Sequence, residues 1–530
     1  MVRASLRLVL CLGSCALCSA AKRGASPHLP RNPSPPLLHD SILTTIGKSP
    51  LIRLRRLAPS GVDVYVKAEA FNPGGSVKDR LALGAIAWGE QTGALRRGQT
   101  VVEASSGNTG IGLALVCAAT GHPFVCVMAE SFSVERRKLM RLLGAKVVLT
   151  NPAHKGSGMV RKARALARRH GWFRPRQFES EANAWVHRET TGPEILDALA
   201  SESKKPDAVV LAYGTGGTLK GVGDCVRARC PDAKIIVCEP DNAPLLYSGE
   251  PTPYDRRGEA TAPHASWRPH LLQGWATDFV PKLVDDARAA GHVDAVRHVS
   301  GDEALATARA LAAKEGLLTG PSGGGCVAAA LAHARTLPRG SVVVAMLADT
   351  GERYLSTPLF GDIPADMTAE EKAIDASAPT APPPPPSLPA VTAPAEAFVA
   401  ATNRRHRVVV WSLEYCEFCW TVFKLLDAIG VPYHKVDIDS FEFAEGNRGN
   451  QYRAALANMT ACNTFPQVFV GGEFQGGAAD ACIAWKKGEL QGVLEKAGLK
   501  RGGRNAWKGY AGDPFEFLPK WMSQNPLRDR

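Results

Sequence analysis

The sequence predicts two α/β domains in tandem, a large one followed by a small one. Short runs rich in β-branched residues alternate with longer helical patterns from about Ser41 to Phe360, which is typical of a mostly parallel sheet covered by helices. A shorter alternation of the same kind follows residue 400. Between them, residues 376–395 are rich in Pro, Ala, Ser and Thr and contain the unbroken proline run 382–386, which predicts a semi-rigid spacer.

The N-terminal segment is expected to be a targeting leader. Arg3 and Arg7 precede an apolar run, Leu8 to Leu17, that is too short to span a membrane and is followed by small residues. No acidic residue occurs before Asp40. We therefore assign residues 1–40 to a cleavable leader for the secretory pathway or for an organelle, a plastid or a mitochondrion. A disordered terminus with an accidental apolar run is the alternative.

In the large domain, residues 41–360, each expected strand is a short buried run and each expected helix carries an apolar stripe. The expected strands are Val62–Val66, Phe124–Met128, Lys146–Leu149, Ala208–Leu211, Ile235–Cys238 and Val342–Leu347, and the clearest helices are Arg136–Leu143 and Glu303–Glu315.

The small domain, residues 401–499, repeats this pattern in a shorter chain. Its expected strands are Val408–Trp411, Lys435–Ile438 and Gln467–Val470, arranged around a helix that begins near Cys416. Residues 361–400 are assigned to the linker, and residues 500–530 form a tail without an assigned structure.

Composition excludes several classes of function. The formal net charge is +12, but basic residues are scattered among acidic ones and form no stripe interleaved with aromatics, so a nucleic-acid partner is not expected. The 13 cysteines are spread too thinly for a disulfide scaffold, and no Cys/His cluster has zinc spacing. No further segment is apolar for long enough to span a membrane. Small-molecule substrates are the expected partners.

Three glycine-rich turns follow strands and open helices in the large domain. Backbone N–H groups converge at such junctions, and the helix dipole favours an anion there. The turn Gly214–Thr218 suits a phosphate, the turn Ser105–Gly110 suits a carboxylate, and the turn Gly320–Gly325 presents one hydroxyl, that of Ser322. Each signal alone is weak, because tight strand–helix turns also use glycine for packing.

A lysine stands at the start of another helix, within Asn72–Arg80. Such a lysine is usually a surface cation. Together with a phosphate cradle and a carboxylate cradle, however, Lys78 provides the amine with which an enzyme holds pyridoxal phosphate and an amino-acid substrate.

These motifs identify a family. Residues 41–360 resemble cysteine synthase (O-acetylserine sulfhydrylase) of the cysteine synthase/cystathionine β-synthase family, whose members are fold-type II pyridoxal-phosphate enzymes with a tryptophan synthase β-like fold of two subdomains. The matching stretches, in family order, are Thr45–Leu51, Ser76–Arg80, Ser106–Gly110, Glu135–Lys138, Thr190–Ile195, Gly214–Thr218 and Gly351–Ser356.

The resemblance implies a role for each matching residue. Lys78 would bind the cofactor covalently and move the α-proton of the substrate. Asn108 would bond the cofactor's ring oxygen, and Ser322 would face its pyridine nitrogen. The phosphate would lie in the loop made of Gly214, Thr215, Gly216, Gly217 and Thr218, and the substrate carboxylate would be held by Ser105, Ser106, Thr109 and Gln177. The enzyme would make L-cysteine from O-acetyl-L-serine and sulfide, and family members are commonly homodimers.

Departures from the family leave the substrate open. Ser105 replaces the usual threonine, and the segment between Tyr247 and His270 is longer than in relatives. One alternative is condensation of serine with homocysteine, as in cystathionine β-synthase. The other is a redox-binding module whose synthase-like half is a scaffold without turnover.

The small domain carries a second motif, Cys416-Glu417-Phe418-Cys419, at the start of its helix. A helix N-terminus favours a thiolate at Cys416, and Cys419, one turn later, can resolve a mixed disulfide. Half of a zinc site and a buried pair are the alternatives for an isolated C-x-x-C.

Two further stretches, 464–469 and 476–480, decide between these readings, and residues 401–499 resemble a glutaredoxin, a thioredoxin-like fold. The resemblance makes Cys416 the nucleophile and glutathione the co-substrate. The residues expected to contact glutathione are Thr464, Phe465, Pro466 and Asp480. Leu413 and Glu417 stand where the family usually has lysine and proline, which removes positive charge and rigidity beside the thiol.

Overall fold

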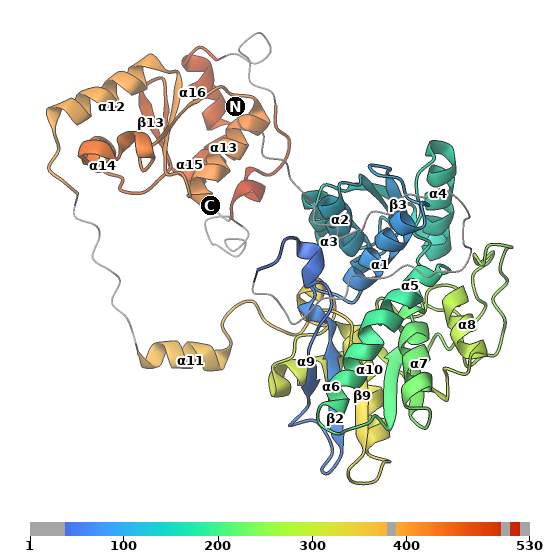
Figure 1. Cartoon of the computed structure of the whole chain (residues 1–530). Coiled ribbons are helices and arrows are strands. Elements are labelled where there is room, and N and C mark those ends of the chain that lie inside the picture. The colour runs from blue at the N-terminus through green and yellow to red at the C-terminus, as the bar shows by residue number, and fades with distance from the viewer. Residues whose placement is uncertain (1–37, 379–387, 500–508, 520–530) are drawn as a thin grey trace, which may run out of the picture. The chain divides into compact units, whose positions relative to one another are not determined.

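The computed structural model describes residues 38–378, 388–499 and 509–519. They divide into two compact units, and the boundary along the chain lies between Glu371 and Lys372 (Figure 1). The predicted leader, apart from its last three residues, and the whole proline run 382–386 lie outside the described residues. Within the described ranges, no helix is both long enough and apolar enough to cross a bilayer.

The large unit contains two sheets. The first has six strands in the order β1-β2-β9-β6-β7-β8, with only the β1–β2 pair antiparallel. Its strands are β1 (Leu51–Arg53), β2 (Asp63–Ala68), β6 (Ala208–Ala212), β7 (Lys234–Pro240), β8 (Ala295–Val299) and β9 (Val342–Leu347). The second sheet has three parallel strands, β3 (Val101–Ala104), β4 (Phe124–Ala129) and β5 (Lys146–Thr150).

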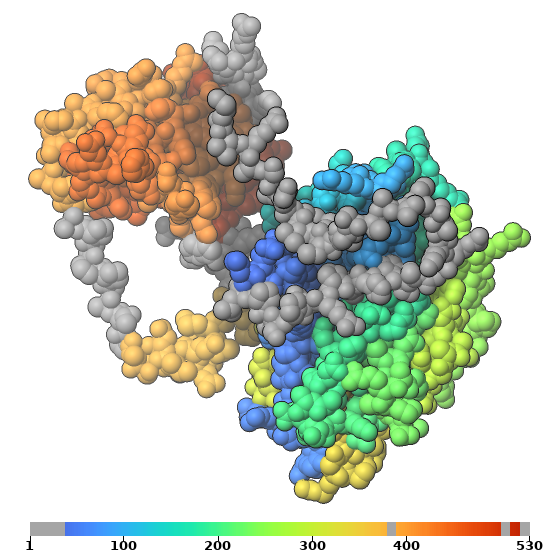
Figure 2. All heavy atoms as spheres, viewed as in Figure 1, coloured from blue at the N-terminus to red at the C-terminus, as the bar shows by residue number. Residues whose placement is uncertain are grey.

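Helices cover both sheets. The small sheet is surrounded by α1 (Lys78–Gln91), α2 (Asn108–Thr120), α3 (Val134–Leu142) and α4 (Lys155–His170) (Figure 1). The large sheet packs against α5 (Glu181–Val186), α6 (Gly192–Ala200), α7 (Gly217–Arg229), α8 (Lys282–Ala289), α9 (Gly301–Glu315) and α10 (Pro321–Ala334). The space-filling view shows a continuous green surface in the region of the large unit where Figure 1 labels α6 and α7 (Figure 2).

Burial on both faces explains why the central strands were recognisable from sequence. Every residue of β9 is buried, and β6 and β7 are buried at all but one position each. Such strands read as continuous apolar runs instead of alternating ones. The edge strand β8 was not predicted, because its Arg297 and His298 interrupt the apolar pattern and only Val299 is buried. The α/β fold class is confirmed.

The small unit is a four-stranded sheet in the order β11-β10-β12-β13 with helices around it. Its strands are β10 (Val408–Ser412), β11 (His434–Asp437), β12 (Gln467–Val470) and β13 (Glu473–Gly476), and its helices are α12 (Ala393–Arg405), α13 (Glu417–Ile429), α14 (Arg448–Thr460), α15 (Ala478–Lys487) and α16 (Glu489–Lys496). Strand β10 pairs parallel with β11 and antiparallel with β12.

The small unit extends beyond both ends of the range 401–499. Helix α12 begins inside the segment that we assigned to the linker and buries Ala395 and Val399 in the unit's core. In the tail, the short helix Pro514–Phe517 buries Phe515 in the same unit. The exposed helix α11 (Ala369–Ser377) also falls inside the assigned linker and buries no residue. Helix α12 was missed because its Ala-rich sequence resembles that of the neighbouring spacer.

Candidate functional site

One cavity of the large unit gathers the residues that the sequence singled out. It lies where the two sheets meet, and residues from β-strand ends and helix N-termini line it. Among its lining residues are all the predicted cofactor and substrate residues except Gly217: Lys78, Ser105, Ser106, Asn108, Thr109, Gln177, Gly214, Thr215, Gly216, Thr218 and Ser322.

Lys78 is the first residue of α1 and faces this cavity. The preceding Val77 donates its backbone N–H to the Ala348 carbonyl at 2.8 Å, which ties the turn to the end of β9 and brings Lys78 close to Asp349. Burial lowers the pKa of the Lys78 ammonium, although the carboxylates of Asp349 and Glu69 oppose the shift. A lysine with a lowered pKa has more of its neutral, nucleophilic form at neutral pH.

The loop Gly214–Thr218 joins β6 to α7 and presents backbone N–H groups at the helix N-terminus. Gly216 has φ +90°, a conformation that favours glycine. A Cβ atom at Gly214 would clash with the carbonyl oxygen of Gly274, and one at Gly217 would clash with the side chain of Asn183. The glycines are therefore required by the close packing of this loop, which matches a seat for a phosphate group.

Two buried side chains that sequence reasoning missed hold this loop from behind. Asn183 donates from Nδ2 to the hydroxyl oxygen of Thr215 at 2.9 Å. His187 lies 3.2 Å from the Thr218 hydroxyl through Nε2 and 2.8 Å from the Thr191 hydroxyl through Nδ1. Burial, together with the nearby cations Arg80 and Lys78, lowers the pKa of His187 to about 3. His187 is therefore neutral, with one ring nitrogen donating and the other accepting.

The predicted carboxylate cradle is also assembled. The Ser105 hydroxyl accepts from the backbone N–H groups of Gly107 (3.1 Å) and Gly110 (2.8 Å). The Thr109 hydroxyl donates to Gln177 Oε1 at 2.8 Å. These side chains thus hold the turn in shape through bonds to each other, and the turn opens helix α2 beside the cavity.

Asn108 is bonded by two residues, Asp349 and Arg353, and Asp349 is in turn bonded by Tyr354; the sequence analysis gave none of the three a role. Its Nδ2 donates to Asp349 Oδ2 at 2.7 Å, and its Oδ1 accepts from Arg353 Nη1 at 3.1 Å. Tyr354 donates its hydroxyl to the same Asp349 oxygen at 2.6 Å. The signal for two of them was present, because Arg353 and Tyr354 lie in the matching stretch Gly351–Ser356.

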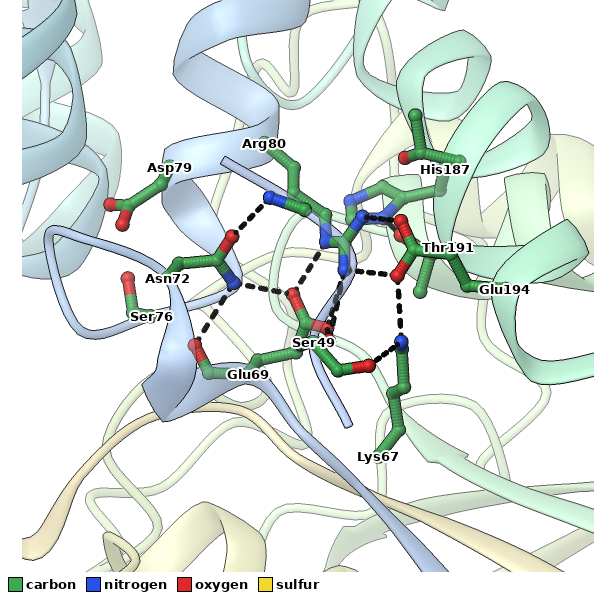
Figure 3. A network of polar contacts seen from close by, with 12 residues as sticks. Ser49, Lys67, Glu69, Asn72, Ser76, Asp79, Arg80, His187, Thr191 and Glu194 are labelled. Carbon is green, nitrogen blue, oxygen red and sulfur yellow. Dashed lines mark hydrogen bonds and ion pairs between the residues drawn. The ribbon is translucent and has the colours of Figure 1, made fainter. Parts of the chain in front are cut away.

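A buried ion network anchors the helix that begins with Lys78 (Figure 3). Arg80 bonds Glu69 at 2.6 Å and Glu194 at 2.7 Å, and Lys67 bonds Glu194 at 2.6 Å. Ser49 donates to Glu69. The network ties α1 to β2 and α6, so it connects the stretch Ser76–Arg80, which contains Lys78, to two matching stretches that had no assigned role, Thr45–Leu51 and Thr190–Ile195.

The charges in this network are well compensated. Burial alone would raise the pKa of Glu194, but Arg80 and Lys67 outweigh burial and lower it to about 2. Glu69 and Arg80 are both almost completely buried. A buried pair of this kind is stable only while both partners remain.

Ser322 lies in the first turn of α10, is buried and lines the cavity. The donor set of the cavity therefore combines an amine with a lowered pKa, a glycine seat for an anion, an amide and a hydroxyl. These groups fit pyridoxal phosphate, which carries an aldehyde, a phosphate, a hydroxyl oxygen attached to its ring, and a ring nitrogen.

The small unit brings its two predicted cysteines together. Cys416 caps α13, and its sulfur accepts the N–H of Cys419 at 3.4 Å. Cys416 is partly exposed, whereas burial raises the pKa of the fully buried Cys419 thiol. The Cys416 sulfur lies 3.8 Å from the carbonyl of Phe465, whose peptide bond to Pro466 is cis.

The expected glutathione residues flank this thiol on separate elements. Thr464 is exposed just before β12, and Asp480 lies in the first turn of α15, where it accepts the Gly477 N–H at 2.8 Å. The Phe465 carbonyl lies beside the Cys416 sulfur, whereas among the described residues Asp480 makes no hydrogen bond to Cys416 and instead bonds the Gly477 N–H.

Comparison with known proteins finds a matching family for each of the two units. The pyridoxal-phosphate dependent enzyme family matches residues 42–349, and the glutaredoxin family matches residues 408–475. O-ureido-L-serine synthase of Streptomyces lavendulae is 48% identical over 329 residues, 62% of this chain and 94% of that protein. Cysteine synthase of Staphylococcus aureus (strain Mu50 / ATCC 700699) is 42% identical over 322 residues, 61% of this chain and 97% of that protein. A crystal structure of O-ureido-L-serine synthase aligns with a TM-score of 0.58 at 46% identity, covering 63% of this chain and 99% of that one.

Proposed function

The chain belongs to the pyridoxal-phosphate dependent enzymes, and from that premise we propose that its large unit makes L-cysteine from O-acetyl-L-serine and sulfide. In this reaction the Cβ–O bond of the substrate breaks, a Cβ–S bond forms, and acetate leaves. The observation that carries the proposal is the shared cavity, in which the Lys78 amine faces the glycine loop Gly214–Thr218 and the Ser322 hydroxyl.

Each residue has a part that follows from its chemistry. When bound, pyridoxal phosphate supplies an electron sink for bonds broken at Cα and Cβ of an amino acid. Lys78 would hold the cofactor, and its amine would take the proton from Cα of the substrate as a general base. The loop Gly214–Thr218 grips the phosphate, and His187 and Asn183 keep its threonine hydroxyls in place.

The remaining residues orient the substrate. The turn Ser105–Gly110 and Gln177 hold the α-carboxylate, as backbone N–H groups at the start of α2 favour an anion. Ser322 offers the ring nitrogen a hydroxyl in place of a carboxylate, so it imposes no positive charge there. Weaker withdrawal of electrons favours early departure of the β-substituent over a long-lived carbanion.

A second product deserves equal testing. The relative named O-ureido-L-serine synthase is 48% identical, compared with 42% for the relative named cysteine synthase. O-Ureido-L-serine is also a serine derivative substituted at Cβ, so the same cavity chemistry would serve if the nucleophile were hydroxyurea. Homocysteine is the third nucleophile to include, because condensation of serine with homocysteine is the remaining alternative.

One assay series tests the proposal. The purified holoenzyme receives O-acetyl-L-serine with sulfide, hydroxyurea or homocysteine, and L-serine with homocysteine, and kcat/KM is measured for each pair. We expect sulfide with O-acetyl-L-serine to give the highest value and Lys78→Ala to abolish turnover. A higher value for another pair would replace the proposed substrates, and purified protein that stays colourless with added cofactor would refute the whole assignment.

For the small unit we propose a glutathione-linked thiol–disulfide oxidoreductase. Its support is the partly exposed Cys416 beside the buried Cys419 and the Phe465–Pro466 segment. Loss of glutathione-dependent reductase activity in Cys416→Ser is the expected result, and undiminished activity would exclude Cys416 as the nucleophile.

Assembly as a homodimer through the large unit is a further proposal, which light scattering of the purified chain tests.

A further inference from the structure

Arg136 is a buried cation at the cavity, and neither the proposed mechanism nor the matching motifs give it a role. It lies in the first turn of α3, is 5% exposed, and lines the same cavity as Lys78. Its neighbour on the same helix, Lys138, is exposed to solvent.

The contacts of the Arg136 guanidinium are all neutral. Nη1 donates to the Ser106 carbonyl at 3.3 Å, and Nη2 donates to Gln273 Oε1 at 3.0 Å. The guanidinium carbon lies 5.1 Å from the centre of the Tyr354 ring. Nε is buried and has no hydrogen-bond partner. Among the described residues, no carboxylate lies within 4 Å of this guanidinium.

A buried charge without a counter-ion is costly, so its presence needs a reason. Arg80, the buried arginine in the ion network of Figure 3, pairs by contrast with two carboxylates, those of Glu69 and Glu194. The absent partner of Arg136 therefore points to an anion that arrives with a ligand.

The position of Arg136 indicates which anion. A Cβ atom at Gly107 would lie 2.7 Å from Arg136 Cδ and 3.1 Å from Nε, so the guanidinium packs directly against the Ser106–Gly107 turn. This turn opens α2 and forms the carboxylate cradle. The side chains of the cradle, Ser105, Thr109 and Gln177, are neutral and already bond to each other or to the backbone.

We propose that Arg136 supplies the positive charge for the α-carboxylate of the amino-acid substrate, acting through the Ser106–Gly107 turn as a positioning residue. This inference rests on the proposed function, because it assumes an amino-acid substrate. It adds that recognition of the carboxylate depends on a buried guanidinium behind neutral donors, and it gives Gly107 a reason to lack a side chain.

The test compares two ligands that differ only in the carboxylate. Holoenzyme is titrated with L-alanine and with L-alaninamide, neither of which has a β-leaving group, and the visible absorption of the cofactor reports binding. We expect the wild type to prefer L-alanine and R136Q to lose roughly tenfold or more of that preference, since an opposite charge several ångströms away at a partly buried site contributes about this much to carboxylate binding. R136K should keep more of the preference than R136Q, because it keeps the charge.

The matched control is K138Q, which removes one positive charge from the exposed face of the same helix and should keep the preference within about twofold, because exposed charges are screened. Equal weakening of both ligands in R136Q would indicate a packing role only and would overturn the inference, as would an unchanged preference.

A second measurement needs no variant. In the wild type, acetate should compete with L-alanine, whereas acetamide should not, and lack of competition by acetate overturns the inference. A different result would refute the proposed function alone. If the enzyme prefers L-alanine to L-alaninamide but catalyses β-replacement with no nucleophile, the proposed reaction is wrong and the role of Arg136 still holds.

Discussion

Glu179 shows how a single buried carboxyl group gives the large unit a pH dependence. Its Oε2 is buried without a hydrogen-bond partner. Burial raises the pKa of Glu179 to about 8, helped by the neighbouring carboxylates of Glu103 and Glu259 and opposed by Arg174 and Arg176. Glu259 belongs to the long segment 247–270, so this segment packs against the residues that follow the carboxylate cradle.

The sign of the effect follows from proton linkage. The folded state binds the Glu179 proton more tightly than the unfolded state, so the stabilisation is complete below the unfolded pKa near 4.5 and is lost as pH rises towards 8. We expect Glu179→Gln to gain stability relative to wild type across this window, by at most about 1.4 kcal/mol per pH unit. Urea unfolding at pH 5, 6, 7 and 8 measures the difference. A constant difference between the two proteins would contradict the raised pKa.

Glu69 gives a second prediction at this scale. Glu69→Gln removes the charge that compensates the fully buried Arg80, and we expect a loss of about 3 to 5 kcal/mol in the free energy of unfolding of the large unit. The control is Asp197→Asn, which breaks the exposed pair with Arg229 and should cost less than about 1 kcal/mol. Equal losses in denaturant titrations of the two variants would show that burial of the network does not increase its contribution to the free energy of unfolding.

At the residue scale, the sequence located contiguous groups and missed distant partners. Lys78, Ser105 and Thr218 were predicted because each stands inside a recognisable local motif. Asp349 and His187 were not, since their roles arise from contacts with residues 241 and 31 positions away in the chain. Spacing along the chain carries no information about such contacts.

Among the elements, the loop from β6 to α7 is the most constrained part of the site. Gly214→Ala would place a methyl group against the backbone carbonyl of Gly274, which is held by the fold and has no rotamer with which to move away. We expect the variant to bind pyridoxal phosphate at least about tenfold more weakly, because the loop must open to relieve the clash. The apparent Kd comes from absorbance titration of the apoenzyme with the cofactor.

The control for this loop is Gly361→Ala, whose added Cβ would meet only ordinary contacts of 3.6 Å and longer. Cofactor affinity should be unchanged in that variant. If Gly214→Ala also binds the cofactor normally, the loop does not form the phosphate seat.

Strands were easier to predict than boundaries at the element scale. Buried strands such as β6 and β9 consist of continuous β-branched residues, so sequence places them within one or two positions. Helix α12 was not predicted, because Ala-rich residues such as Ala395 look the same in a spacer and in a helix that covers a sheet.

For the whole molecule, two separate compact units predict independent folding. A chain that ends at residue 371 should retain the visible absorption of the cofactor and a kcat/KM for β-replacement within about twofold of the full chain. Cys416→Ser in the full chain should leave the same value unchanged. A shortened chain that cannot hold the cofactor would show that the units depend on each other for stability.

The division of the whole chain was predicted from composition, because the proline-rich segment differs so strongly from its flanks. The assignment of both families rests on motifs and is confirmed by matches over residues 42–349 and 408–475. The substrate was not predictable to the same degree, since relatives with two different names, O-ureido-L-serine synthase and cysteine synthase, are similarly close to this chain at 48% and 42% identity.

The helix that carries Cys416 depends on residues near the C-terminal end of the described chain. Phe517 accepts a hydrogen bond from the Thr421 hydroxyl of α13 at 2.9 Å, and Phe515, 2% exposed, packs beside it. Removal of these residues would therefore expose apolar surface under the redox helix and loosen its second turn. A protease that cleaves the chain after Leu499 would therefore change the reactivity of Cys416 and Cys419 without cleaving at either cysteine.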